Sequence, residues 1–292
     1  MDFFPAQADD IFVSRNSSGI ISEYSSAGTT INPTVLSGLT SVGRMGISGN
    51  TLFFDDVHHA SIGAYNILTG TYNPSFIYTG ISYNPFFYAV SGNTLYTADQ
   101  TGDIHSYNLT TGAALSTITL PSGDVVNDMA IWRNNLYVIA DSNSGIIGDY
   151  DISTGTYSHV LTVPGAEALA ANSNDLFVAT YNKIYGFNLS GVGPSSFSIT
   201  GPNLILGLGA SDTDLYIAET GIHAIGDYNL ATGILNSLFI TGDSSYSPFG
   251  VTVYATPEPQ VIILLVGSLI ALGGWQSRKT FGTHCGRRVA KD

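Results

Sequence analysis

Hydrophobic and polar positions along the chain form a repeating pattern of short strands. In one unit, Leu95–Ala98 is interpreted as a short strand ended by Asp99, and Ile104–Asn108 alternates apolar and polar residues. Such alternation is typical of a strand with one buried face. Thr110–Gly112 predicts a turn, because glycine tolerates the positive φ that many hairpins need. Ala114–Leu120 and Met129–Trp132 complete four predicted strands per unit.

The unit recurs six times, at a spacing of about forty residues. The first apolar anchors are Ile11, Leu52, Leu95, Leu136, Leu176 and Leu215, and the second, aromatic anchors are Tyr24, Tyr65, Tyr107, Tyr150, Phe187 and Tyr228. Four strands per repeat at this period are typical of a β-propeller blade. A solenoid with this period would need helices or end caps, and no helical stripe is evident before residue 260.

The first and last repeats are incomplete in complementary ways. The chain enters at the second strand of a unit, DDIFV at 9–13, and it leaves on a first-type strand, SPFGVTVYA at 247–255. Pairing these two segments would close a ring and remove exposed sheet edges. The sequence therefore predicts an all-β, six-bladed β-propeller over residues 9–255, closed by its N- and C-terminal strands. An open array of hairpins is the alternative.

The charge of the chain excludes one class of partner. Of 292 residues, 22 are acidic and nine are basic, which gives a net charge of −13. The basic residues of the repeats are Arg15, Arg44, Arg133 and Lys183. An acidic body repels phosphate backbones, so nucleic acid is not expected as a partner. The single cysteine, Cys285, excludes an internal disulfide and a cysteine-based zinc site.

Both ends of the chain differ from the repeats. Residues 1–8 contain Ala6-Gln7-Ala8, the A-x-A form of a signal-peptidase site, and are interpreted as a signal-peptide remnant or a disordered N-terminus. Near the other end, an uncharged run at 261–275 predicts a short hydrophobic helix, below the ~20 residues of a full membrane span. Arg278 and Lys279 follow it and favour the cytoplasmic side. Residues 280–292 form a basic tail.

The order of elements over 256–279 resembles the PEP-CTERM sorting signal of bacterial envelope proteins. Pro257-Glu258-Pro259 stands first, followed by the apolar run and then by Arg278 and Lys279. This resemblance implies export, processing near the PEP motif by an exosortase-like membrane enzyme, and a final place in the cell envelope or outside the cell. The chain continues through 280–292, whereas the family usually stops soon after the basic group. An ordinary C-terminal membrane anchor is the alternative.

The strand-turn-strand runs, such as residues 94–112, resemble six-bladed propellers of the NHL, YVTN and gluconolactonase-like kind. This resemblance implies the architecture but no activity, because propellers host many unrelated functions. The lactonase-like members hold a divalent metal with Glu, Asn and Asp from different blades. Asn127, Asp128 and Glu167 are of these types, but they lie on two neighbouring blades and do not match that family's motif residue by residue.

The positions just before each first-type strand are predicted to ring one mouth of a central channel. The aligned residues are Arg44, Phe87, Asp128, Ala168, Gly207 and Phe249. Polar groups interrupt this pattern at Arg44 and Asp128, and they interrupt the pattern one position earlier at Asn127 and Glu167. Breaks of this kind can mark a ligand-binding site. A local ion pair between Arg44 and an acid is the alternative.

Acidic residues and histidines occupy the loops that follow the second predicted strands. They are Asp55, Asp56, His58, His59, Asp99, Asp103, Asp141, Glu219 and His223. Carboxylates there would suit Ca²⁺ or another divalent metal, but an aspartate that bonds its own turn shapes a loop equally well. The structural interpretation is favoured, and neither a metal site nor a cofactor is predicted. Adjacent strand residues point to opposite faces, which argues against a metal at His58-His59.

Together these features predict an exported, non-catalytic binding or scaffold module at the cell envelope. The predicted partners are a surface polysaccharide or an envelope protein, besides the processing enzyme and the membrane. A metal-dependent, lactonase-like hydrolase is the first alternative, and a structural extracellular matrix protein is the second.

Overall fold

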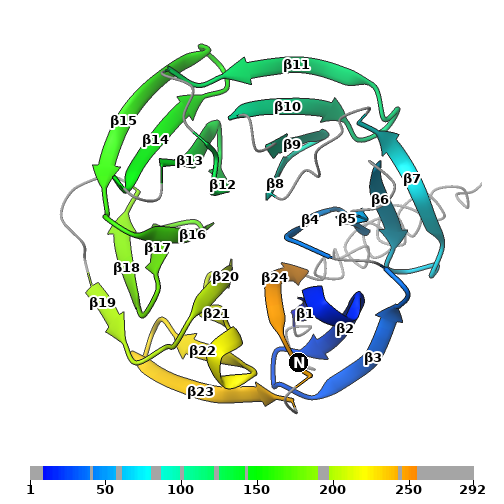
Figure 1. Ribbon diagram of the computed structural model, residues 1–292, viewed down its shortest axis with the longest axis vertical. Coiled ribbons are helices and arrows are strands. Elements are labelled where there is room, and N and C mark those ends of the chain that lie inside the picture. The colour runs from blue at the N-terminus through cyan, green and yellow to red at the C-terminus, as the bar shows by residue number, and fades with distance from the viewer. Residues whose placement is uncertain are drawn as a thin grey trace, which may run out of the picture. The chain divides into compact units, whose positions relative to one another are not determined.

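Six four-stranded antiparallel sheets stand radially around a central channel (Figure 1). The computed structural model describes residues 9–39, 42–56, 61–79, 87–98, 102–121, 125–141, 144–189, 197–242 and 245–254. Each sheet is one blade, and its innermost strand borders the channel. The predicted all-β, six-bladed propeller is confirmed.

The blades are numbered in chain order, and their strands are given from the channel outwards. Blade 1 contains β24 (Pro248–Tyr254), β1 (Asp10–Arg15), β2 (Ile20–Ser25) and β3 (Thr30–Leu36). Blade 2 contains β4 (Met45–Ser48), β5 (Thr51–Asp56), β6 (Ser61–Asn66) and β7 (Tyr72–Tyr78). Blade 3 contains β8 (Phe87–Ser91), β9 (Thr94–Ala98), β10 (Asp103–Asn108) and β11 (Ala114–Thr119).

The other three blades repeat this order. Blade 4 contains β12 (Asp128–Trp132), β13 (Asn135–Asp141), β14 (Ile146–Asp151) and β15 (Thr156–Thr162). Blade 5 contains β16 (Ala166–Ala171), β17 (Asp175–Thr180), β18 (Lys183–Asn188) and β19 (Phe197–Thr200). Blade 6 contains β20 (Ile205–Ala210), β21 (Asp214–Glu219), β22 (Ala224–Asn229) and β23 (Ile234–Thr241). Two short 3₁₀ helices, η1 (Asn16–Ser18) and η3 (Thr220–Ile222), follow β1 and β21.

Blade 1 closes the ring by joining the two ends of the repeat array. Strands β1 and β24 pair antiparallel, from Asp10 opposite Tyr254 to Arg15 opposite Pro248, with a bulge between Ser14 and Arg15. This pairing confirms the predicted closure and gives both strands a partner that neither has locally in the sequence.

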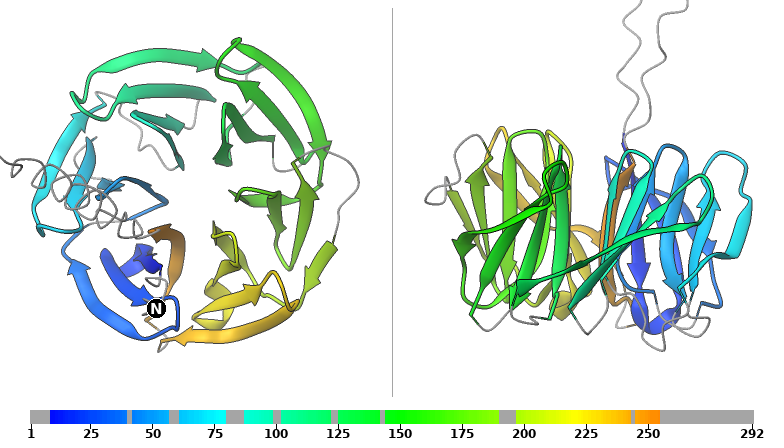
Figure 2. Two further views of the ribbon diagram at one scale, coloured as in Figure 1. Left: turned by 180° about the vertical axis from the view of Figure 1, so that it is seen from behind. Right: turned by 90° about the horizontal axis from the view of Figure 1, so that it is seen from above.

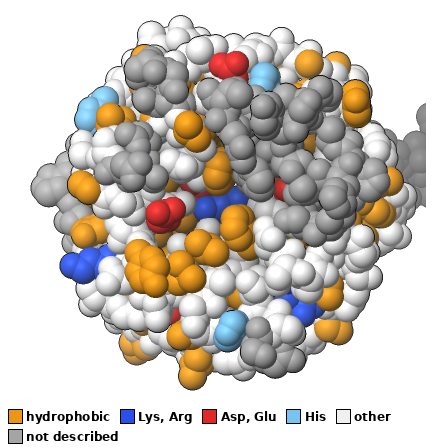
Figure 3. Space-filling view, viewed as in Figure 1, with side chains coloured by type: hydrophobic (Ala, Val, Ile, Leu, Met, Phe, Trp, Pro, Cys, Tyr) orange, Lys and Arg blue, Asp and Glu red, His pale blue; other side chains and the backbone are white. Residues whose placement is uncertain are grey.

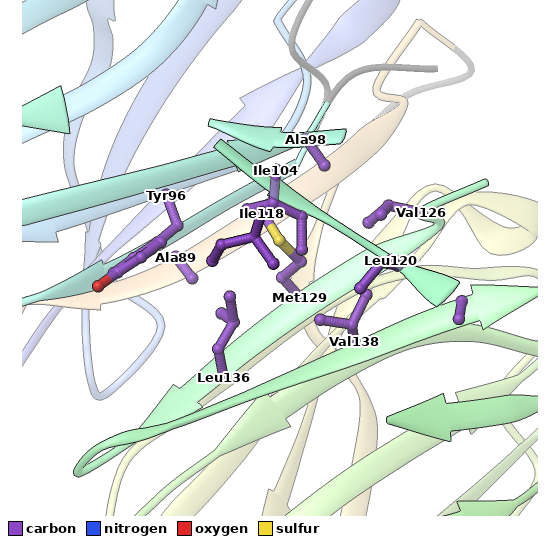
Figure 4. Close-up of a cluster of buried hydrophobic side chains, with 11 residues drawn as sticks. Ala89, Tyr96, Ala98, Ile104, Ile118, Leu120, Val126, Met129, Leu136 and Val138 are labelled. Carbon is purple, nitrogen blue, oxygen red and sulfur yellow. The ribbon is translucent and has the colours of Figure 1, made fainter. Parts of the chain in front are cut away.

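The hydrophobic core consists of six clusters, one between each pair of neighbouring blades. On β5, Leu52 and Phe54 pack towards blade 1, while Phe53 packs towards blade 3. Successive residues of a strand point to opposite faces, so a strand between two blades must be apolar on both. Figure 4 shows the cluster in which side chains of blades 3 and 4 meet. All six first anchors predicted from the sequence are 0 % exposed.

Equivalent turns join the third and fourth strands of blades 2, 3, 4 and 6. In blade 3, the Asn108 Oδ1 atom accepts hydrogen bonds from the backbone nitrogens of Thr110, at 2.9 Å, and Thr111, at 3.0 Å. Gly112 then adopts a φ of 71° and donates its N–H to the Asn108 carbonyl. The left-handed conformation explains the glycine and confirms the predicted turn.

The strands of every blade run between two faces of the ring (Figure 2). We call one of them the Arg44 face. It is formed by the segments that precede the first strand and follow the second strand of each blade. The opposite face carries the turns between third and fourth strands.

Several predictions concern residues that the structure leaves undescribed. These are segment 1–8, the PEP motif at 257–259, the apolar run at 261–275, and the basic residues Arg278 and Lys279. Within the ranges given above, no helix combines the length and the apolar character needed to cross a membrane.

Candidate functional site

The channel along the ring axis has a volume of about 200 Å³. It is lined by the innermost strands β4, β8, β12, β16, β20 and β24. Each of these strands lies at the inner edge of its sheet, so its inward backbone groups lack a neighbouring strand and face the channel. The lining therefore combines polar backbone groups with residues such as Met45, Met129 and Val251, whose side chains pack into the clusters between blades.

Close approach of the innermost strands keeps this channel narrow. A Cβ atom built on Gly209 of β20 would lie 2.9 Å from the carbonyl oxygen of Val251 on β24. Any side chain there would push β24, the closing strand, away from β20. Glycine is therefore required at position 209 because there is no space for a side chain.

Arg44 crosses the channel mouth and touches residues from several other blades. It directly precedes β4 of blade 2, and its Nη1 atom lies 3.0 Å from Asp128 Oδ2 of blade 4. Its Nη2 atom donates a 3.2 Å hydrogen bond to the backbone carbonyl of Glu167 in blade 5. Its guanidinium carbon lies 5.9 Å from the ring centroids of both Phe87 in blade 3 and Phe249 in blade 1. Five blades thus meet at one side chain.

Burial dominates the electrostatics of the Arg44–Asp128 pair. Asp128 is 2 % exposed, and its Oδ2 atom also accepts a 2.7 Å hydrogen bond from the backbone nitrogen of Leu169. Burial raises the pKa of Asp128 to about 6, although Arg44 and the backbone N–H groups of Leu169 and Met129 oppose this shift. Burial likewise lowers the pKa of Arg44, which arginine tolerates without losing its charge.

The four residues singled out in the sequence are not equivalent in the structure. Arg44 and Asp128 form the ion pair that the sequence left open as an alternative. Glu167 joins them through its backbone carbonyl, and its side chain is exposed. Asn127 is half-buried and donates its backbone N–H to the Ile139 carbonyl. Ligand binding by these residues stays a prediction.

Apolar side chains surround the charged mouth, and sequence reasoning gave them no role. Val125, Tyr181 and Ile222 on the Arg44 face are 48 %, 58 % and 37 % exposed, respectively. Figure 3 shows hydrophobic side chains grouped beside charged atoms near the centre of this face. The alignment of the repeats had placed Phe87 and Phe249 in the same column as Arg44. The whole set of aligned positions, rather than its polar members alone, could have identified Phe87 and Phe249 as residues of the mouth.

The acidic loop residues that the structure describes are bound to the protein itself. Asp55 Oδ1 accepts the Gly43 N–H at 2.7 Å, and Glu219 Oε2 accepts the Asn203 N–H at 3.1 Å. Asp103 Oδ1 accepts the Thr119 hydroxyl at 2.8 Å. These bonds support the structural interpretation of the loop acids.

The described residues of the mouth offer few ligands for a metal ion. Among the described residues, no group of three His, Cys, Asp or Glu side chains is arranged to hold an ion. A cation at Asp128 would have to displace the guanidinium of Arg44. The pair His58-His59 and Asp99 lie outside the described residues, so the structure does not test them.

Comparisons with known proteins reveal the fold and little else. No protein family profile matches the chain, and no curated protein matches its sequence. Many solved structures match in three dimensions. One is a chain in the crystal structure of a nidogen/laminin complex, with a TM-score of 0.72 and 13 % sequence identity, over 85 % of this chain and 98 % of that one. At this identity, the similarity establishes a shared propeller fold alone.

Proposed function

We propose that this protein is a non-catalytic binding module of the cell envelope, with a surface polysaccharide as its ligand on the Arg44 face. The convergence of five blades on one channel mouth carries this proposal. At this mouth, residues that are distant in the sequence form a surface that combines aromatic rings, an ion pair and an exposed carboxylate. Ligands of ring-shaped folds commonly bind in such central depressions, on loops held by a rigid scaffold.

The chemistry of the exposed side chains favours a sugar chain. The ring of Tyr181 is more than half exposed, and the rings of Phe87 and Phe249 are partly exposed. Aromatic faces offer flat apolar contact area to sugar rings, and the tyrosine hydroxyl adds a hydrogen-bonding group. Glu167 and Lys183, both exposed on or beside this face, supply further acceptors and donors for hydroxyl groups.

Binding to a polysaccharide is tested with the full-length protein on a glycan array, followed by calorimetry on each hit. Tyr181→Ala and Glu167→Gln are expected to weaken binding at least about tenfold, which corresponds to about 1.4 kcal/mol each. Leu115→Ala is the matched control, because Leu115 is similarly exposed, at 55 %, but lies on the outer strand β11. Equal losses in all three variants, or no glycan hit, would contradict the proposal.

The delivery of this module to the envelope is a separate part of the proposal and is supported by sequence order alone. Replacing Pro257, Glu258 and Pro259 with alanine in the full-length protein is expected to leave it unprocessed and associated with the membrane. Replacing Arg287 and Arg288, which lie beyond the segment that resembles the sorting signal, serves as the control. Fractionation of the producing cells and mass measurement of the C-terminus distinguish the outcomes. Normal processing of the triple variant would exclude a PEP-type signal.

A further inference from the structure

Arg44 and Asp128 close the channel where it meets the Arg44 face. The pair joins blades 2 and 4, and each partner also bonds blade 5, through the Glu167 carbonyl and the Leu169 N–H. We propose that this pair is a proton-operated plug, and that neutralising Asp128 releases Arg44 towards solvent and opens the channel at the Arg44 face. Only the biological role of channel opening rests on the proposed function, because opening itself is defined and measured without a ligand.

The closed position of Arg44 depends on the charge of one partner. The guanidinium is almost fully buried, and its Nε atom has no hydrogen-bond acceptor among the described residues. Removing the charge from one member of a buried pair leaves the other as an uncompensated buried charge, which is strongly unfavourable. Once Asp128 is neutral, the guanidinium is left with the Glu167 carbonyl and the rings of Phe87 and Phe249, none of which carries a balancing charge.

A second carboxylate that can balance the charge of Arg44 lies at the surface. Arg44 already reaches the backbone carbonyl of Glu167, whose exposed carboxylate acts electrostatically on the guanidinium. An outward rotation of the Arg44 side chain exchanges Asp128 for Glu167 and rehydrates the charge. The two positions of Arg44 thus differ in which carboxylate balances it, and the protonation state of Asp128 selects between them.

Asp128 is suited to this role because its pKa lies close to neutral pH. Its pKa of about 6 follows from burial, against the opposing effect of Arg44. The strands packed against β12 are β8, β13 and β16. On β8, burial raises the pKa of Tyr88 well above its usual value, so this side chain stays neutral. Strand β13 carries Tyr137, whose pKa is also raised by burial, and ends at Asp141, while β16 carries Glu167.

Two methionines provide a built-in reporter of the plug. Met45 and Met129 directly follow Arg44 and Asp128 in the sequence and border the channel. Their side chains pack in the clusters between blades 1 and 2 and between blades 3 and 4, and the two residues are only 7 % and 3 % exposed. Hydrogen peroxide transfers one oxygen atom to a methionine sulfur, giving the sulfoxide and water, and the rate depends on access to that sulfur. Opening of the plug should therefore accelerate oxidation of both residues.

The test exposes the full-length protein to hydrogen peroxide at pH 5 and at pH 7.5, with N-acetylmethionine in the same tube as a correction for intrinsic reactivity. Peptide mass spectrometry then follows sulfoxide formation at Met45 and Met129. If oxidation follows the protonated fraction of Asp128, the corrected rates should be about thirtyfold higher at pH 5. Equal corrected rates at the two pH values in the wild-type protein overturn the proposal without any variant.

Three variants identify the titrating group. Asp128→Asn keeps an acceptor for the Leu169 N–H but cannot ionise, and should show rapid oxidation at both pH values. Asp227→Asn is the matched control, because the pKa of Asp227 is also raised to about 6, mainly by burial, on β22, two strands away from the channel. It should retain the full pH dependence. Glu167→Gln should retain the pH midpoint but show slower oxidation at pH 5.

The outcomes separate this inference from others. Circular dichroism confirms that each variant is folded before oxidation is measured. A pH dependence that survives Asp128→Asn, or one that disappears in Asp227→Asn or Glu167→Gln, assigns the titration to another group and overturns the plug. Loss of glycan binding with an intact pH-dependent oxidation contradicts the proposed function alone, whereas glycan binding without pH-dependent oxidation contradicts only the plug.

Discussion

Two sets of repeated positions in this propeller behave in opposite ways. In the turns between third and fourth strands, the same kind of side chain recurs and accepts hydrogen bonds from backbone N–H groups of its own turn. These residues are Asn66, Asn108, Asp151 and Asn229. At the channel mouth, the equivalent positions carry a different residue in most blades, yet four of them meet at one point: Arg44, Phe87, Asp128 and Phe249.

The difference lies in the distance along the chain over which each residue finds its partners. A turn residue is satisfied within about four residues, so blades 2, 3, 4 and 6 solve the same local problem with the same chemistry. A mouth residue depends on blades that lie far away in the sequence, so its identity reflects its neighbours across the ring. Perturbing each set should therefore have different consequences for stability, coupling and pH dependence.

The largest effect is expected at the mouth. Arg44→Met should lower the free energy of unfolding by about 3 kcal/mol at pH 8, because it leaves the Asp128 carboxylate buried without its partner. The loss should shrink at pH 5, where Asp128 takes up a proton. Urea denaturation at both pH values measures it. The double variant Arg44→Met/Asp128→Asn should recover most of the stability, since it removes both buried charges, and a loss that is the same at both pH values would contradict this account.

The sign of the pH effect in the unaltered protein follows from the pKa of Asp128. Its value of about 6 in the folded state lies above that of an unfolded aspartate, so the folded state binds the proton more tightly. Ionisation of Asp128 therefore opposes folding. The free energy of unfolding therefore gains a stabilising contribution from Asp128 as the pH falls through 6, and it loses this contribution as the pH rises.

A smaller effect is expected at another long-range contact, in the closing blade. The Ser14 hydroxyl donates to the Gly43 carbonyl at 2.7 Å and accepts the Gly250 N–H at 2.8 Å, all within buried surroundings. Ser14→Ala should cost about 2 kcal/mol, because it leaves a buried N–H group without a partner. Thermal unfolding followed by circular dichroism measures this change. Ser18→Ala is the control, since the Ser18 hydroxyl donates to the exposed, local carbonyl of Arg15, and equal effects would argue against a role in ring closure.

The turns should respond less, and independently of one another. Asn66→Ala removes two side-chain acceptor bonds in an exposed turn and Asn108→Ala removes three, and each variant should cost about 1 kcal/mol. Because the two turns lie in different blades and share no partner, their effects should add in the double variant. Urea denaturation of the set gives the coupling free energy. A coupling as large as that between Arg44 and Asp128 would remove the distinction between local and long-range positions.

The same distinction explains what the sequence could predict. The period, the strands, the Gly112 turn and the pairing of 247–255 with 9–14 follow from local patterns and from the phase of the repeat. The Arg44 column was identified, but not the crossing of the channel from blade 2 to blade 4, because the reach of one arginine depends on the radius of the ring. That radius is set by contacts such as Gly209 against Val251, which hydrophobic periodicity does not encode.

The smallest effect is expected where the local chemistry already tolerates a change. Asp151 does in blade 4 what asparagine does in blades 2, 3 and 6, and hydrogen bonds from Ser153 and Thr154 lower its pKa, the opposite of the shift at Asp128. The contribution of its charge to stability is therefore present above the unfolded pKa and lost as the pH falls through the lowered folded value. Asp151→Asn should lower the unfolding temperature slightly at pH 7, where the charge contributes to stability, and flatten its decline at the acid end.

The reciprocal change, Asn108→Asp, provides the control for that comparison, because it should reproduce the acid-sensitive behaviour in blade 3. Differential scanning calorimetry of both variants between pH 3 and pH 7 gives the two profiles. If Asp151→Asn destabilised the protein as much as Asn108→Ala, the carboxylate would serve more than its own turn. The third-to-fourth-strand turns would then have to be counted, with the mouth, among the positions where one blade depends on another.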